Sequence, residues 1–90
     1  ADLNNNKITD ISVINNLKNL TKLQQLYLDN NEITDISVIK YLINLEYLDI
    51  GNNYIKNISF VKNLNNLRIL DIEGLQLGSN QVEYINQCSN

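Results

Sequence analysis

Carboxylates at repeating positions are the side chains of this chain whose type and spacing could do chemistry. Asp49 and Asp71 each stand between a leucine and an isoleucine, and Asp29 and Glu73 occupy neighbouring positions of the same pattern. Paired carboxylates can act as a general acid and a general base. Clustered carboxylate oxygens can also bind calcium, and acidic residues on an open surface attract a basic partner. The pattern therefore raises three functions at the outset: catalysis, calcium binding and recognition of a basic molecule.

Catalysis and metal binding both lack the other groups that they require. The chain has no His, and neither Cys88 nor any Ser has a recognisable base beside it. Asp49 and Asp71 are expected one strand spacing apart, ~4.8 Å along the backbone, on a surface without a pocket. Calcium takes about six to eight oxygens from a folded loop, and no loop with the required Gly spacing is present. We therefore expect no enzyme, no cofactor and no metal site.

Length and charge narrow the class of protein further. Ninety residues with 43% hydrophobic content make one domain with a modest core. The net charge of −3 disfavours nucleic acid, because binding to phosphates needs clustered Lys and Arg. No apolar run approaches the ~20 residues of a membrane span, so membrane insertion is not expected. The single cysteine, Cys88, excludes an internal disulfide, and we expect it to be a small buried apolar group.

The chain is built from repeats. The heptapeptide ITDISVI occupies residues 8–14 and again 33–39, and a relaxed copy occupies residues 55–61. Asn6, Asn31 and Asn53 mark one position in successive units, and the first interval is longer than the second by one Leu-x-x step. A repeat of this length predicts stacked supersecondary units that bury their apolar faces against each other.

Each unit shows two kinds of apolar periodicity. Residues 26–28, 48–50 and 70–72 alternate between apolar and polar, which predicts short half-buried strands. Ile36, Ile39, Leu42 and Leu45 recur at every third position, which is typical of a 3₁₀ or short α-helical turn. Stacked units therefore place a parallel sheet on one side and helical turns on the other.

Polar side chains mark the turns between these elements. Asp10, Asp35 and Asn57 directly precede the apolar stripes, where they can accept hydrogen bonds from backbone N–H groups two or three residues on. The repeated Asn6, Asn31 and Asn53 follow the strands and are predicted to point inward and satisfy backbone groups. Leu75 takes this place in the fourth unit. We interpret the other Asn residues, which are numerous, as compositional bias.

At this point the chain resembles a known family. The segment LQQLYLDNNEITDI, residues 23–36, is similar to the leucine-rich repeat, in the 22-residue subtype of internalins and SDS22-like phosphatase regulators. The resemblance implies an α/β right-handed solenoid, or horseshoe, with a short parallel sheet on the concave face and 3₁₀ or short helices on the convex face. It also implies protein binding on the concave face. A location outside or on the cell follows from the internalin likeness, and a cytoplasmic one from the SDS22 likeness.

The domain organisation expected from the repeats has two parts. Residues 1–77 hold about three and a half repeats, the first incomplete, and residues 78–90 form a capping tail. Val82, Ile85 and Cys88 share a stripe, which predicts a short helix that covers the last unit. The first unit has no cap, so the chain is expected to be part of a longer array or to self-associate end to end.

The candidate binding face follows from the strand pattern, since residues that flank the inward leucines point to the concave side. Five of the ten acidic residues fall in these columns and none of the seven basic ones does. Tyrosine is common at binding hot spots, and acidic charge favours a basic partner. Gly51 is expected to leave a dip there. The predicted partner-binding residues are Gln25, Tyr27, Asp29, Tyr47, Asp49, Ile69, Asp71 and Glu73.

Two functions remain at this stage. The first is a protein–protein interaction module that recognises its partner, basic on this charge pattern, through the concave face. The alternative is a structural spacer segment of a larger leucine-rich-repeat surface protein, with no ligand of its own. Exposed acidic residues also serve as simple solubility devices, which fits the spacer. The two differ in one respect: the concave face of a spacer tolerates substitution.

Overall fold

A computed structural model of the chain describes residue 2 and residues 21–87. Its strands are β1 (Gln25–Tyr27), β2 (Tyr47–Asp49) and β3 (Ile69–Asp71), and its 3₁₀ helices are η2 (Ser37–Tyr41), η3 (Ser59–Asn63) and η4 (Ser79–Gln81). A short helix, α2 (Val82–Gln87), follows η4. Expectations for Asn6, Asp10, Cys88 and the uncapped first unit fall on residues outside the described ones.

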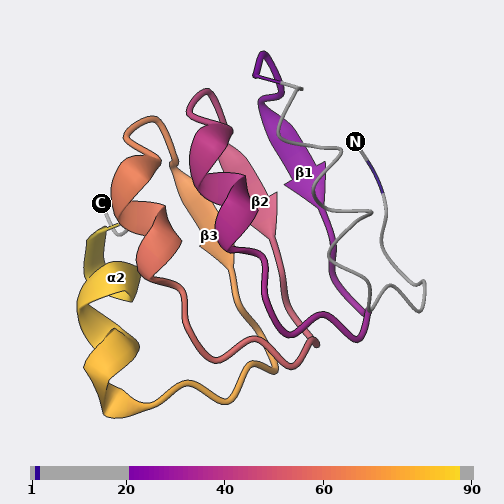
Figure 1. The fold of residues 1–90 in the computed structure, drawn as a ribbon, viewed down its shortest axis with the longest axis vertical. Coiled ribbons are helices and arrows are strands. Elements are labelled where there is room, and N and C mark those ends of the chain that lie inside the picture. Colours follow the sequence, from indigo (N-terminus) through magenta and orange to yellow (C-terminus); the bar gives the residue numbers. More distant parts are fainter. Residues whose placement is uncertain (1, 3–20, 88–90) are drawn as a thin grey trace.

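The strands form one parallel sheet in the order β1-β2-β3. Leu26 pairs with Leu48, and Leu48 pairs with Leu70, so successive repeats are in register. The 3₁₀ helices η2 and η3 pack against each other on the opposite side of the molecule from the sheet (Figure 1). The expected solenoid of strand, turn and short helix is confirmed, with strands that begin one residue earlier than the pattern indicated.

The core lies between the sheet and the 3₁₀ helices. Each strand sends one leucine inward at its centre and another apolar residue directly after it, as strand alternation requires. Fully buried examples are Leu26, Leu28, Leu48 and Ile50, all with no exposed surface. Burying a side chain of this size contributes about 1.5–3 kcal/mol. The remaining core residues come from the helical side: Ile33, Ile36, Ile39, Leu42, Leu45, Ile55, Ile58, Phe60, Val61, Leu64 and Leu67.

The repeated asparagine does the work that its position predicted. Asn53 is 6% exposed, and its Nδ2 lies 3.0 Å from the carbonyl oxygens of Leu28 and Ile50. Its Oδ1 accepts from the backbone N–H of Ile33 at 3.0 Å. Asn31 Nδ2 likewise donates to the Leu28 carbonyl at 2.9 Å. These amides link one coil to the next, because a single side chain satisfies backbone groups of both.

Other asparagines also have structural roles, so compositional bias was an incomplete interpretation. Asn30 and Asn52 adopt left-handed backbone conformations with φ of 60° and 52°, and Gly74 takes the corresponding place with φ of 85°. Asparagine and glycine tolerate this region better than other residues. Asn44 and Asn66 donate from Nδ2 to carbonyls of the preceding coil, at 2.6 and 3.2 Å. The sequence carried a signal, since the members of each pair are one repeat apart.

The entries to the 3₁₀ helices are held as expected. Asp35 Oδ1 accepts from the backbone N–H of Ser37 at 2.9 Å, and Asn57 Oδ1 accepts from that of Ser59 at 2.8 Å. Both side chains therefore bond two residues ahead and turn the chain into η2 and η3. The two residues are interchangeable for this purpose because the amide and the carboxylate each present an acceptor oxygen.

The C-terminal helix packs on the helical side of the last coil. α2 contacts η3, with Tyr84 and Ile85 partly buried against the core (Figure 1). Gln81 is only 6% exposed, and its Oε1 accepts from the backbone N–H of Ile58 at 2.8 Å. Val82 is 49% exposed, so its predicted place on the buried stripe was wrong. Gln81, which directly precedes α2, takes the buried position instead.

Helix length bears on one further class of protein. Within residue 2 and residues 21–87, no helix combines the length and apolar character that crossing a bilayer demands. The longest helical run there is η4 with α2, which joins Ser79–Gln81 to Val82–Gln87. The division into repeats over residues 1–77 and a capping tail over residues 78–90 stays a prediction.

Candidate functional site

Strand register places the predicted concave residues in columns across the sheet. Gln25 lies opposite Tyr47, and Tyr47 lies opposite Ile69. The second column runs through Tyr27, Asp49 and Asp71, and Asp2 pairs with Tyr27 at its end. The in-register parallel sheet therefore brings together side chains that lie one repeat apart in the sequence.

Two tyrosines form the centre of this face. The rings of Tyr27 and Tyr47 have centroids 5.0 Å apart and planes tilted by 40°. The Tyr27 hydroxyl lies 3.4 Å from Gln25 Oε1, to which it donates. Burial raises the pKa of Tyr47, and the negative charges of Asp49 and Asp71 raise it further. The Tyr47 phenol thus stays protonated at neutral pH and keeps an O–H to donate.

The two central aspartates also have a structural role. Asp49 Oδ1 accepts from the backbone N–H of Gly51 at 3.0 Å, and Asp71 Oδ1 accepts from that of Glu73 at 3.1 Å. Burial raises the pKa of Asp49, the Gly51 N–H bond opposes this, and the nearby Asp29, Asp71 and Glu73 raise it. Negative charge is therefore concentrated at this end of the strands.

The third column holds Asp29, Gly51 and Glu73, directly after the second. Asp29 Oδ2 accepts from Asn30 Nδ2 at 2.8 Å, while the side chain of Glu73 is exposed. A Cβ on Gly51 would lie 2.7 Å from the backbone oxygen of Glu73 and 3.3 Å from Asp49 Oδ1. The expected dip at Gly51 is therefore wrong, because the next coil fills the space. Glycine is required there for close approach of two backbones.

A hollow lies at the opposite end of the strands, and sequence reasoning missed two of its residues. It has a volume of ≈ 530 Å³ and is open to solvent. Ile69, at its wall, is 54% exposed. Arg68 brings a positive charge to this rim, although the basic residues had been assigned away from the face. The signal was their place in the repeat, since Glu46 and Arg68 directly precede two members of the first column. The lining residues are Gln25, Glu46, Tyr47, Arg68 and Ile69.

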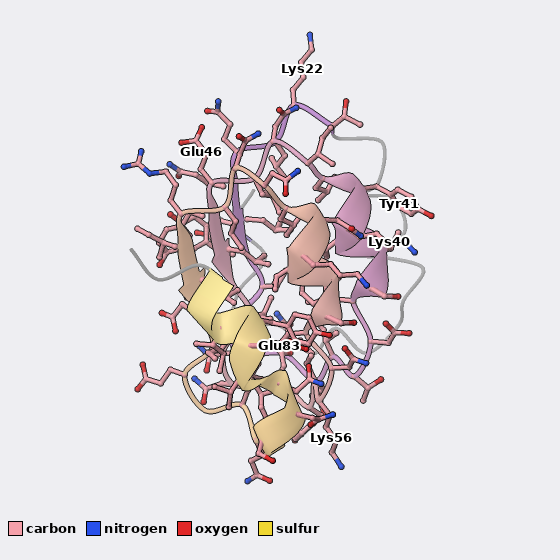
Figure 2. All side chains as sticks on the ribbon, turned by 90° about the vertical axis from the view of Figure 1, so that its left-hand side faces the viewer. Lys22, Lys40, Tyr41, Glu46, Lys56 and Glu83 are labelled. Carbon is pink, nitrogen blue, oxygen red and sulfur yellow. The ribbon has the colours of Figure 1, made fainter. Side chains whose placement is uncertain are left out.

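The helical side has a different surface. Lys40 Nζ lies 5.3 Å from the centroid of the Tyr41 ring, a cation–π contact on η2. Figure 2 shows Lys40 and Tyr41 on the side of the 3₁₀ helices and Glu46 on the side of the strands. Among the residues that the structure describes, no group of three or more His, Cys, Asp or Glu side chains is arranged to hold a metal ion.

The fold defines a class of protein, which comparison with family models identifies. The model described as "Leucine Rich repeats (2 copies)" matches residues 1–41, 21–63 and 43–90. The chain belongs to the leucine-rich repeat family. Such repeats generally mediate protein–protein interaction and are typically not enzymes.

Solved structures give the particular relatives. An internalin of Listeria monocytogenes is 31% identical with a TM-score of 0.76, over 97% of this chain and 31% of that one. Internalin C2 of the same organism is 35% identical with a TM-score of 0.78, over 91% and 34%. A leucine-rich-repeat protein of Leptospira interrogans is 30% identical with a TM-score of 0.82, over 98% and 22%. A search of curated proteins finds no match.

These neighbours give the chain an internalin-like character. The chain spans between about a fifth and a third of the length of the structures that it matches. Their activities and partners belong to proteins several times longer. The likeness thus supports the family and the fold, and the site must be argued from this chain's own residues.

Proposed function

We propose that this chain is a protein–protein interaction module that binds its partner through the concave sheet. The observation that carries the proposal is the Tyr27–Tyr47 pair, whose rings lie 5.0 Å apart in the middle of a solvent-facing sheet. Tyrosine offers contact area and a polar tip at a low cost in conformational entropy. The binding residues are Gln25, Tyr27, Asp29, Tyr47, Asp49, Ile69, Asp71 and Glu73.

The charge of this surface favours a basic partner. Carboxylates of three successive coils gather at one end of the strands, and their mutual repulsion contributes to the raised pKa of Asp49. A Lys or Arg side chain seated there would relieve that repulsion and would accelerate encounter. Arg68 and Glu46, at the hollow, would then contact the rim of the same partner.

The alternative is a structural spacer within a larger leucine-rich-repeat surface protein. One observation favours it: Asp49 and Asp71 each accept a backbone N–H at the end of their strand, so the acidic column has a purpose without any ligand. A spacer retains those hydrogen bonds when the charges are removed. Binding requires the charges and the aromatic rings as well.

The test is affinity capture from an extract of the source organism with two matched baits. Asn keeps the acceptor oxygen that closes the strand end and removes only the charge, so the fold is preserved. Asn57 already occupies the position equivalent to Asp35, which makes the same change safe in the control. The binding-face variant carries Tyr27→Ala, Tyr47→Ala, Asp49→Asn and Asp71→Asn, and the control carries Tyr41→Ala, Tyr54→Ala, Asp35→Asn and Glu83→Gln.

Both variants lose two tyrosines and two negative charges, so they differ only in where the changes lie. Circular dichroism and thermal unfolding first establish that each is folded. We expect a protein that wild type and control retain and the binding-face variant loses. Equal capture by all three baits, or capture by none, would contradict the proposal and leave the spacer.

A further inference from the structure

The last coil is open along its strand side. Leu26 and Leu48 have no exposed surface, but Leu70, the third member of that column, is only partly buried. The next column behaves alike, since Leu28 and Ile50 are fully buried and Ile72 is partly buried. Apolar side chains that each inner coil covers completely are therefore left half covered at β3.

Backbone hydrogen bonds stop at the same place. The N–H of Leu28 donates to the Asp49 carbonyl at 2.8 Å, and that of Ile50 donates to the Asp71 carbonyl at 3.0 Å. Ile72 is the next member of this series, and the described residues contain no fourth strand. Ile69 N–H and the Asp71 carbonyl bond toward β2. The intervening Leu70 N–H and carbonyl consequently point to the outer edge, because polar groups alternate along a strand.

The end cap does not reach this edge. α2 contacts η3 and η4, on the helical side of the coil. Figure 1 shows α2 beside the 3₁₀ helices, with β3 forming the border of the sheet. A row of backbone groups at a sheet border is a template for another strand.

We propose that β3 binds an extended segment of a partner protein as an added strand, in which Lys or Arg alternates with apolar residues. Alternate side chains of such a segment would face opposite sides of the sheet. One set would complete the burial of Leu70 and Ile72. The other set would lie on the concave side, beside Ile69, Asp71 and Glu73.

Charge decides between this partner and a second copy of the chain. Asp71 and Glu73 lie on the concave side of β3, and the raised pKa of the adjacent Asp49 shows that the region is already rich in negative charge. Stacking a second copy end to end would place its Asp2, which pairs with Tyr27, in the column beside Asp71. Like charges opposite each other destabilise a strand pair, whereas Lys or Arg stabilises it.

This edge site is separate from the tyrosine pair, so it does not rest on the proposed concave-face function. It shares Ile69, Asp71 and Glu73 with that face but makes its main contacts through the backbone of β3. Loss of one site therefore leaves a measurable signal from the other. Variants at Tyr27 and Tyr47 report on the concave face, and the amides of Leu70 and Ile72 report on the edge.

The experiment uses a synthetic heptapeptide, Lys-Ile-Lys-Val-Lys-Ile-Lys, blocked at both ends, with the ¹⁵N-labelled chain. Hydrogen exchange is followed at single amides by NMR. At a peptide concentration ten times the Kd, we expect exchange at the Leu70 and Ile72 amides to slow about tenfold, because exchange requires release of the strand. The Leu48 amide lies inside the sheet and should change little.

Two matched peptides and two pairs of variants separate the contributions. A peptide with Glu in place of Lys tests charge, and one N-methylated at alternate amides removes the edge hydrogen bonds; both should lose binding at least about tenfold. Asp71→Asn with Glu73→Gln should weaken the basic peptide, while Asp35→Asn with Glu83→Gln should not. Tyr27→Ala with Tyr47→Ala should leave its affinity unchanged.

Three outcomes would overturn the proposal. Exchange at Leu70 and Ile72 that no peptide slows would show that the edge accepts no strand. Equal binding of the N-methylated peptide would place the contact on side chains alone. Protection of these amides without peptide, together with a dimer in analytical ultracentrifugation, would make a second copy the occupant.

Discussion

The two sides of the last coil end in different ways. On the helical side, Val61 and Leu64 are as well buried as Ile39 and Leu42 one coil earlier, at 0–1% exposed. On the strand side, Leu70 is partly exposed although its counterpart Leu48 is fully buried. One end of the solenoid is thus closed over its helices and open over its sheet.

The difference follows from what each kind of element needs. A 3₁₀ helix bonds its own backbone, so an apolar cover and one acceptor for a stray N–H are enough to close it. α2 and Gln81 supply these on η3. A strand border presents N–H and C=O groups that only another extended chain can pair. A short helix can therefore close one side and has no means of closing the other.

The largest expected effect compares leucines within one column on each side. Leu48→Ala should lower the free energy of unfolding by about 2–5 kcal/mol, and Leu70→Ala by roughly half as much, because part of its side chain already meets water. On the helical side, Leu42→Ala and Leu64→Ala should both cost about 2–5 kcal/mol. Urea unfolding measures all four. Equal losses at Leu48 and Leu70 would remove the contrast between the two sides.

A smaller effect is expected at the cap itself. Gln81→Leu keeps the volume of the side chain but leaves the Ile58 N–H without its acceptor, which should cost about 1–3 kcal/mol. Hydrogen exchange at the Ile58 amide should accelerate by more than exchange at the Leu48 amide. If the Ile58 amide exchanged no faster than in wild type, Gln81 would not be what closes the helical side.

The close approach of the last two coils offers a similar test on the sheet side. Gly51→Ala would bring a Cβ to 2.7 Å from a backbone oxygen of the next coil, and should destabilise the protein by about 1–3 kcal/mol. Gly78→Ala is the control, because the Cβ there would meet the flexible side chain of Asn80. Thermal unfolding of both variants measures the difference. A tolerated Gly51→Ala would show that the sheet border shifts freely.

The smallest effect concerns the charge on the open sheet. The raised pKa of Asp49 means that the folded state binds its proton more tightly than the unfolded state, whose value is 3.8. This contribution is present at low pH and is lost as the pH rises from 3.8 through the folded pKa. Asp49→Asn should therefore gain stability relative to wild type across that range. Urea unfolding from pH 3 to 7 checks the sign, and a difference that is constant with pH would contradict it.

Repetition explains how much of this structure the sequence could predict. A residue that recurs once in every unit must occupy one column, so the strands, the core and the role of Asn53 follow from alignment of the chain with itself. The same reasoning would have found Asn44 and Asn66, and also Asn30 and Asn52. They were overlooked because asparagine is so frequent here that its regular positions look like background.

Features that occur once could not be found in this way. Gln81 has no counterpart in another coil, and its partner Ile58 lies 23 residues earlier, so no periodic signal connects them. The exposure of Val82 depends on how α2 is rotated against η3, which side-chain packing decides. Arg68 reached the concave rim through the strand register, although its charge had suggested another face.

The asparagine bonds set a rule for how such a chain can grow. Asn53 binds carbonyls of its own coil and of the coil before it, and nothing beyond. An in-frame duplication of one whole coil would thus bring its own asparagine and leave every existing bond intact. Array length can drift by copying errors in the gene without any redesign of the interior. The segment that contains Gln81 and α2 has no such freedom, since a copy placed between two coils would separate the strands that must pair.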